Sequence, residues 1–77
     1  MKLHAVGEDA LMLYLGDGAD VNTLGQVQAA STAIEAALGD ELTDLVPSYA
    51  SVLILYNPLR SHRHDIARRV RRALQSL

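Results

Sequence analysis

The stretch of sequence that decides the fold is Val46-Pro47-Ser48-Tyr49-Ala50-Ser51-Val52-Leu53-Ile54-Leu55-Tyr56-Asn57-Pro58. Residues 52–55 are all aliphatic and lack the alternation of a half-exposed strand, so we expect a central strand that is covered on both faces. Pro47 has no backbone N–H to donate to a neighbouring strand, and Asn57-Pro58 is a turn signal. The two prolines should therefore bound this strand, which holds no reactive side chain.

The composition around this strand describes one small domain over residues 1–77 with an aliphatic core. The 77 residues are 49% hydrophobic but include no Phe or Trp, so Leu, Val, Ile and Ala must fill the core. The absence of Cys excludes disulfides, thiolate catalysis and cysteine-based metal centres. No segment approaches about 20 consecutive apolar residues, and the first residues lack the hydrophobic run of a signal peptide. We therefore expect a cytoplasmic protein with no membrane partner.

Short apolar runs between turn signals predict four strands. Two are expected near the start of the chain, over residues 2–6 and 10–15, and two later, over residues 42–46 and 51–56. The hydrophobic run Leu53-Ile54-Leu55 places Leu53 in the predicted core, so Leu53→Asp is expected to unfold the domain by burying an unpaired charge.

Helical spacing predicts one helix after each pair of strands. The first should begin near Asn22-Thr23, because Thr23 and Gln26 have the spacing of a capping box, and it should end at Gly39. Ser61 is the expected N-cap of the second. Each helix has an apolar stripe at steps of three and four, namely Leu24, Val27, Ser31, Ile34 and Leu38 in the first and Ile66, Ala67, Val70, Ala73, Leu74 and Leu77 in the second.

The element order, strand-strand-helix twice, predicts an α+β fold. Leu11-Met12-Leu13-Tyr14 is echoed by Leu53-Ile54-Leu55-Tyr56 at an offset of 42, which suggests two ββα units. Pairing the units gives a two-layer ββαββα domain with a four-stranded, mainly antiparallel sheet and both helices on one face. The opposite, apolar sheet face would then be uncovered, which predicts a partner outside this chain.

Three segments resemble the N-terminal domain of a known family. They are Gly7-x-x-Ala10-Leu11 with Leu13-Tyr14-Leu15-Gly16-Asp17, then Asn22-x-x-x-x-Val27, then the stretch from Val46 to Pro58. The family is that of the sporulation-kinase inhibitor KipI, the 5-oxoprolinase component PxpB and allophanate hydrolase subunit 1, and it is similar to part of the carboxyltransferase region of urea carboxylase. Its motif residues here are Gly7, Asn22, Val46, Pro47, Tyr49, Ser51, Leu53, Tyr56 and Pro58. The family usually has Arg in place of Ala50 and Asp in place of Asn57.

The resemblance implies a role in a larger assembly. Family members continue into a C-terminal cyclophilin-like β-barrel, which is absent here, and work with a larger partner subunit, similar to biotin carboxylases, in ATP-dependent opening of 5-oxoproline. We expect no catalytic residue, no cofactor and no metal in this domain, and the resemblance implies that ATP belongs to the parent complex. Two alternatives stay open: a protein-interaction module that inhibits a sensor histidine kinase, and a small domain that self-associates through its uncovered sheet face.

Charge is unevenly distributed along the chain. Residues 1–59 hold one Lys against eight acidic residues, a net charge of −7, whereas residues 60–77 hold six Arg against one Asp, a net charge of +5. Four of these arginines lie outside the apolar stripe of the second helix and predict a basic outer face: Arg68, Arg69, Arg71 and Arg72. This face is either solvated or a docking surface, and nucleic acid is disfavoured because no aromatic residues interleave with the arginines. Tyr49, at the entrance of a strand, is a second candidate for partner contact.

The remaining polar residues do not form a recognisable site. Neighbouring carboxylates such as Glu8-Asp9 are expected in a solvated turn. His62 and His64 are two residues apart at the start of a helix, point in different directions and with His4 fall short of the four ligands of structural zinc. Ser48 and Ser51 have no identifiable base, so no catalytic residues are expected in this domain.

Overall fold

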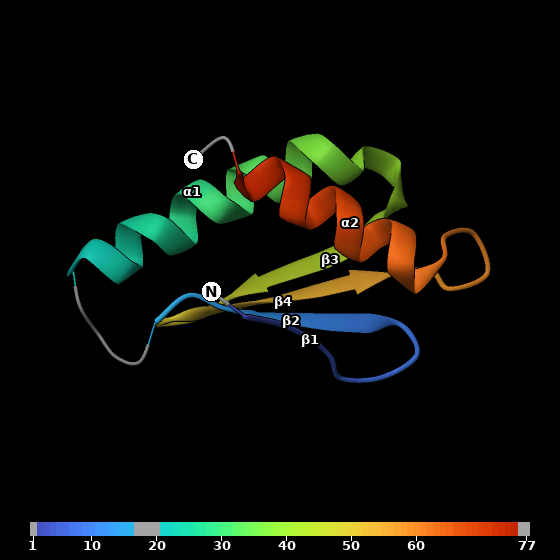
Figure 1. The fold of residues 1–77 in the computed structure, drawn as a ribbon, viewed down its shortest axis with the longest axis horizontal. Coiled ribbons are helices and arrows are strands. Elements are labelled where there is room, and N and C mark those ends of the chain that lie inside the picture. The colour runs from blue at the N-terminus through green and yellow to red at the C-terminus, as the bar shows by residue number, and fades with distance from the viewer. Residues whose placement is uncertain (1, 17–20, 76–77) are drawn as a thin grey trace.

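The computed structural model describes residues 2–16 and 21–75, and it has the predicted ββαββα order of an α+β fold (Figure 1). A short 3₁₀ turn, η1 (Gly39–Glu41), follows the first helix. The main elements are β1 (Lys2–Ala5), β2 (Ala10–Tyr14), α1 (Val21–Leu38), β3 (Leu42–Pro47), β4 (Ser51–Tyr56) and α2 (Arg63–Leu74).

The four strands form one sheet in the order β1-β2-β4-β3, and every neighbouring pair is antiparallel. β2 and β4 are therefore central, with Leu11 opposite Ile54 and Leu13 opposite Val52, whereas β1 and β3 are edge strands. Both helices lie on the same side of the sheet, which confirms the predicted two-layer arrangement (Figure 1). Within the described residues, neither helix combines the length and apolar character needed to cross a membrane.

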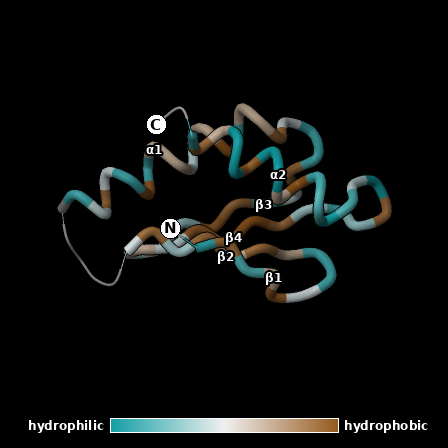
Figure 2. The backbone as a smooth tube through the Cα atoms, viewed as in Figure 1, coloured by the Kyte–Doolittle hydropathy of each residue, from teal (hydrophilic) through white to brown (hydrophobic). Residues whose placement is uncertain are grey.

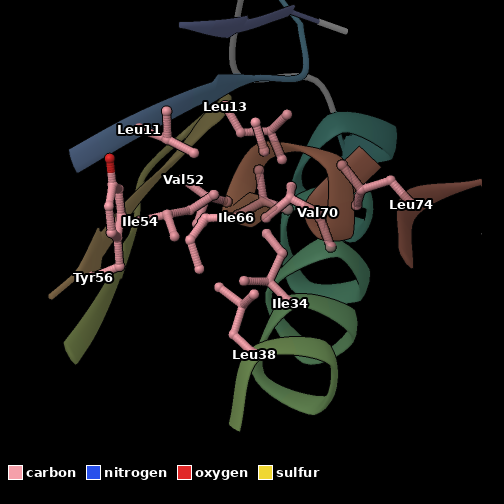
Figure 3. Close-up of a cluster of buried hydrophobic side chains, with 13 residues drawn as sticks. Leu11, Leu13, Ile34, Leu38, Val52, Ile54, Tyr56, Ile66, Val70 and Leu74 are labelled. Carbon is pink, nitrogen blue, oxygen red and sulfur yellow. The ribbon is translucent and has the colours of Figure 1, made fainter. Parts of the chain in front are cut away.

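The core lies between the helices and one face of the sheet (Figure 3). Leu and Ile side chains of β2 and β4 meet the apolar faces of α1 and α2, and the described core cluster is aliphatic apart from one tyrosine, as the composition requires. Its largest fully buried side chains are Tyr56, Leu13, Ile34, Ile54, Ile66, Val27, Val52 and Val70. Such side chains stabilise the fold by roughly 1.5–3 kcal/mol each relative to exposure.

The two faces of β4 are not equivalent, although Figure 2 shows the middle of the strand as hydrophobic. Val52, Ile54 and Tyr56 are buried beneath the helices, whereas Leu53 and Leu55 point to the opposite face and are only partly buried. The expectation that the strand is covered on both faces is therefore wrong for the described chain. Leu53 is not a core residue, because strand side chains alternate between faces and the helices cover only one of them.

The repeat of ββα units is real in element order, but the sequence echo at offset 42 does not mark equivalent positions. Leu11 is buried beneath the helices, whereas its counterpart Leu53 lies on the other face. The residues of β2 in the core cluster have odd numbers, and those of β4 have even numbers. An even offset therefore relates a buried residue of one strand to a residue on the opposite face of the other. An offset of 41 relates Leu11 to Val52 and preserves the buried face.

The structure confirms the predicted C-terminus of α1 but not the predicted capping role of Thr23 at its N-terminus. α1 begins at Val21, so Thr23 lies inside the helix rather than at its N-cap. Leu24 is 51% exposed, and Ala30 is buried in the face that packs on the sheet. Gly39 has a φ of 53°, the left-handed conformation that favours glycine at a helix C-terminus.

The N-cap of α2 is His62, not Ser61. The His64 N–H donates to Nδ1 of His62 at 3.1 Å, so the imidazole serves as the capping acceptor. Ser61 is buried and its hydroxyl donates to Glu41 instead. The predicted inner face is otherwise observed, with Ile66, Ala67, Val70 and Leu74 buried, Ala73 partly buried, and Leu77 outside the described residues.

Candidate functional site

The stretch from Val46 to Pro58, which we call the motif stretch, contains a tight turn at residues 48–50 that joins the edge strand β3 to the central strand β4. We call this turn the motif turn. The Ser48 N–H donates to the Ser51 carbonyl at 2.8 Å, and the Leu15 N–H donates to the Ala50 carbonyl at 2.7 Å. These bonds tie the turn to both β4 and the end of β2. Tyr49, at the tip, is 75% exposed, so the turn holds an aromatic ring in solvent on a well-anchored backbone.

A shallow cleft of about 360 Å³ lies between this turn and the first half of α1. Its walls are mostly apolar, and its described lining includes no charged side chain. The lining residues are Leu24, Val27 and Gln28 of α1 and Pro47, Ser48 and Tyr49 of the turn. A cleft of this kind can receive an apolar side chain of a partner.

The second candidate surface is the sheet face that the helices leave uncovered, which we call the open face. Along the two central strands it is formed by Met12, Tyr14, Leu53 and Leu55, which are partly buried or exposed. Val46 extends it onto β3 and is 46% exposed. At the β1 side, the rings of His4 and Tyr14 meet edge to face, with centroids 5.7 Å apart. An apolar surface of this kind, rimmed by polar residues, is typical of an interaction site.

The predicted basic face of α2 contains three of its four arginines. Arg71 and Arg72 are exposed, and Arg68 pairs with Asp65 at 2.6 Å in an exposed i,i+3 arrangement that contributes little to stability. Arg69 differs from expectation, because its guanidinium turns inward, forms an ion pair with Glu41 and donates from Nη2 to the Ala37 carbonyl at 2.7 Å.

The Arg69 contact belongs to a polar cluster that links α2 to the end of α1 and to η1. Glu41 accepts hydrogen bonds from Arg69 and from the Ser61 hydroxyl, the latter at 2.9 Å. The Arg69 bond, followed by the Ser61 bond, lowers the pKa of Glu41 below its ordinary value. Sequence reasoning missed this cluster because its members are 20 and 28 residues apart, and no local pattern links them.

Tyr56 projects a polar group into the core from the end of the motif stretch. Its hydroxyl is buried and has no hydrogen-bond partner within residues 2–16 and 21–75. Burial raises the pKa of Tyr56 above its ordinary value, so the ring stays neutral. Its backbone N–H donates to the Asp9 carbonyl at 2.9 Å. This environment fits a packing role, not a catalytic one.

Asn57, which stands where the family usually has Asp, still builds the expected turn. Its Oδ1 accepts from the Leu59 N–H at 3.0 Å, and its carbonyl accepts from Arg60 and Ser61. Pro58 lies within this turn. The side-chain oxygen of Asn supplies the acceptor that Asp would supply, so the departure leaves the local structure intact.

The other sequence candidates are dispersed. His4 lies in β1. The rings of His62 and His64 stack at the start of α2 with centroids 5.1 Å apart, so the expectation that this pair points in different directions is wrong. In the part of the chain that the structure describes, no three His, Cys, Asp or Glu side chains group in a way that could hold a metal ion. Gly7, Glu8 and Asp9 are exposed in the bend between β1 and β2, and Asn22 is in the first turn of α1. Of the predicted contact residues, Tyr49 lies at the turn between β3 and β4, whereas the four arginines lie on α2, on the other side of the sheet from the open face.

The fold and these surfaces define a class of protein: a small two-layer α+β domain with an exposed apolar sheet face and an exposed aromatic side chain at the turn between β3 and β4. The chain belongs to the carboxyltransferase domain family, subdomains C and D, whose family model matches residues 1–77. This confirms, at the level of the family, the relationship that the motif stretch indicated.

A solved structure supports the same relationship. The crystal structure of a conserved uncharacterized protein from Pyrococcus horikoshii matches with a TM-score of 0.82 and 25% sequence identity. The match covers 97% of this chain but 37% of that one, so this chain spans little more than a third of its relative. No protein among the curated ones matches this chain.

Proposed function

We propose that this chain is the N-terminal, non-catalytic domain of a protein similar to PxpB of 5-oxoprolinase, also described as allophanate hydrolase subunit 1-like. Its role is to assemble with a C-terminal cyclophilin-like barrel and with a larger partner subunit. The parent complex uses ATP to hydrolyse the lactam amide of 5-oxoproline, which yields glutamate. The observation on which the proposal depends is the carboxyltransferase family match over residues 1–77.

Two features of the chain favour an assembly role. The open face presents Met12, Leu53 and Leu55 on a side of the sheet that no helix of the described residues covers. The partly exposed apolar side chains of this face gain free energy when a partner removes them from water, at roughly 25 cal/mol per Å². The motif turn adds Tyr49, whose ring can supply a large contact area at low conformational cost.

A second candidate function is favoured by the same surface. An uncovered apolar sheet face can also pair with a second copy of itself, which would make the chain a self-associating domain. Inhibition of a sensor histidine kinase is the other function that the family resemblance allows, and it requires a partner of a different kind at the same exposed surfaces.

Coexpression tests the proposal. The chain is coexpressed with a cyclophilin-like barrel domain and with a larger subunit similar to biotin carboxylases, and the purified material is assayed for ADP and glutamate formation that depend on 5-oxoproline. We expect the three components to copurify and to convert 5-oxoproline only in the presence of ATP. Failure to copurify, or ATP hydrolysis that does not respond to 5-oxoproline, contradicts the proposal. Loss of kinase autophosphorylation on addition of the protein would favour the kinase-inhibitor alternative.

Matched variants locate the docking surface. Leu55→Ser on the open face is expected to lower the yield of the complex several-fold. Ala36→Ser is the control, because Ala36 is exposed on a helix that lies on the opposite side of the sheet and belongs to neither candidate surface. Equal yields for the two variants would contradict a role for the open face.

A further inference from the structure

The two edges of the sheet differ in the hydrogen-bonding groups that they present to solvent. Directly after β1, the Val6 N–H donates to the Ala10 carbonyl at 3.1 Å, toward β2. In an antiparallel ladder, successive residues direct their backbone groups alternately toward and away from the partner strand. Leu3 and Ala5 therefore direct their N–H and C=O groups away from β2, and β1 is an edge with outward donors and acceptors.

The opposite edge, β3, has no free outward N–H at Leu45 or at Pro47. The Ser48 N–H donates to Ser51 of β4, so by the same alternation Leu45 and Pro47 face outward. The Leu45 N–H already donates to the Asp44 carboxylate at 2.8 Å, and Pro47 has no N–H. A register shift between Leu42 and Asp44 interrupts the edge further. Proline, charge and bulges are the devices by which edge strands avoid pairing.

We propose that a second copy of this chain adds to β1 as an antiparallel strand. In the register that places His4 opposite His4 of the second copy, Leu3 lies opposite Ala5 of the second copy and Ala5 lies opposite Leu3. The outward N–H and C=O groups of these two residues then form four hydrogen bonds between the copies. The result is a two-fold symmetric dimer in which the two four-stranded sheets join edge to edge.

Charge favours a second copy in this orientation. The segment begins with the basic Lys2 and ends, after β1, with the acidic pair Glu8 and Asp9, and all three side chains are exposed. In this register Lys2 of each copy lies opposite Val6 of the other, two residues before Glu8, so opposite charges gather at each end of the paired strands. Parallel alignment would place like charges together. Because β1 has only four residues, the interface is small and the dimer should be weak.

The test is sedimentation equilibrium between about 10 µM and about 1 mM, the range in which weak protein pairs dissociate. We expect the average mass to rise from that of a monomer toward that of a dimer. Over the same range, hydrogen exchange at the Leu3 and Ala5 amides should slow by about tenfold, because these amides gain partners. The Leu45 amide, which is bonded to Asp44 within the monomer, should not respond.

Two variants at one position separate this edge from other contacts. Ala5→Pro removes the outward N–H and should reduce association at least tenfold, whereas Ala5→Ser keeps the N–H and should associate like the original chain. A monomer at 1 mM, or association that Ala5→Pro leaves unchanged, overturns the proposal; the latter result would point to the open face. If Ala5→Pro does not fold, the exchange data on the original chain decide, and unchanged rates at Leu3 and Ala5 overturn the proposal.

Discussion

Adjacent residues of β4 should respond very differently to the same substitution, because they point to opposite faces of the sheet. Ile54 is fully buried among the helices and the sheet, whereas Leu53 is partly exposed on the open face. We expect Ile54→Asp to unfold the domain and Leu53→Asp to leave it folded. This replaces the expectation, drawn from the hydrophobic run alone, that a charge at Leu53 would unfold the chain.

The magnitudes follow from burial and chain length. At roughly 0.05–0.15 kcal/mol per residue, a 77-residue domain has a free energy of unfolding of about 4–12 kcal/mol. An unpaired carboxylate at Ile54 loses its hydration and also removes the packing of a core side chain, which together cost several kcal/mol, comparable to the whole stability. At Leu53 the carboxylate reaches water, so the loss is limited to apolar burial, about 1–2 kcal/mol.

Urea and thermal unfolding followed by far-UV circular dichroism measure the difference. Leu53→Asp should show a cooperative transition with its midpoint lowered by about 4–16 °C, since 1 kcal/mol corresponds to about 4–8 °C in a domain of this size. Ile54→Asp should show no cooperative transition at 25 °C. A folded Ile54→Asp, or a Leu53→Asp variant that is equally unfolded, would refute the assignment of faces. Ile54→Val, which keeps the site apolar, is the control and should cost about 0.5–1.5 kcal/mol.

Four other substitutions test local features of the structure. Gly25→Ala in α1 should stabilise the domain by about 0.5–1 kcal/mol, because a Cβ there meets no atom within 4 Å. Gly39→Ala should destabilise it by about 1 kcal/mol, because φ at Gly39 is 53°. Equal effects of the two substitutions in urea titrations would contradict this difference. Tyr56→Phe removes a buried hydroxyl without a partner in the described residues and should be neutral or stabilising by about 1 kcal/mol, so a clear loss in thermal stability would show that the hydroxyl is bonded. The pKa of Glu41 is lowered in the folded state, so the contribution of its carboxylate to the free energy of unfolding is present above the ordinary value of 4.5 and is lost as pH falls below it. Glu41→Gln should therefore flatten the fall in stability below that pH. Parallel pH profiles for the two proteins would contradict a stabilising role for the contacts of Glu41 with Arg69 and Ser61.

Local sequence signals located the helices and strands well. They were less successful in assigning the roles of single residues that depend on tertiary packing. Ser51–Tyr56 was predicted with its observed bounds, because turn residues enclose an unbroken aliphatic run. Gly39 marked the end of α1, because few other residues adopt a positive φ at low cost. The start of α1 was predicted within two residues of Val21, but Thr23 lies inside the helix instead of capping it. The N-cap of α2 was assigned to Ser61, although His62 occupies that position.

The candidate site was only partly predictable for the same reason. Tyr49 was correctly singled out as an exposed ring at a strand entrance, and the open face followed from counting two helices against one sheet. Arg69 was grouped with the outward arginines because helical periodicity cannot reveal Glu41, which is 28 residues away in the chain. The cleft beside Leu24 was not predicted, since it exists only where α1 passes the motif turn.

The sequence by itself determined the order of elements, the two-layer α+β class and the family of this protein, because these depend on turn residues, helical periodicity and motif spacing that are written locally in the chain. Only the tertiary structure decided which face of β4 is the core, where Arg69 binds and which sheet edge keeps outward donors. A strand such as Val52-Leu53-Ile54-Leu55 is apolar on both sides, so its pattern assigns neither face to the interior. That choice is made by the helices that pack on one side, and by the hydrogen-bond register that turns Leu3 and Ala5 outward while Asp44 and Pro47 close the opposite edge.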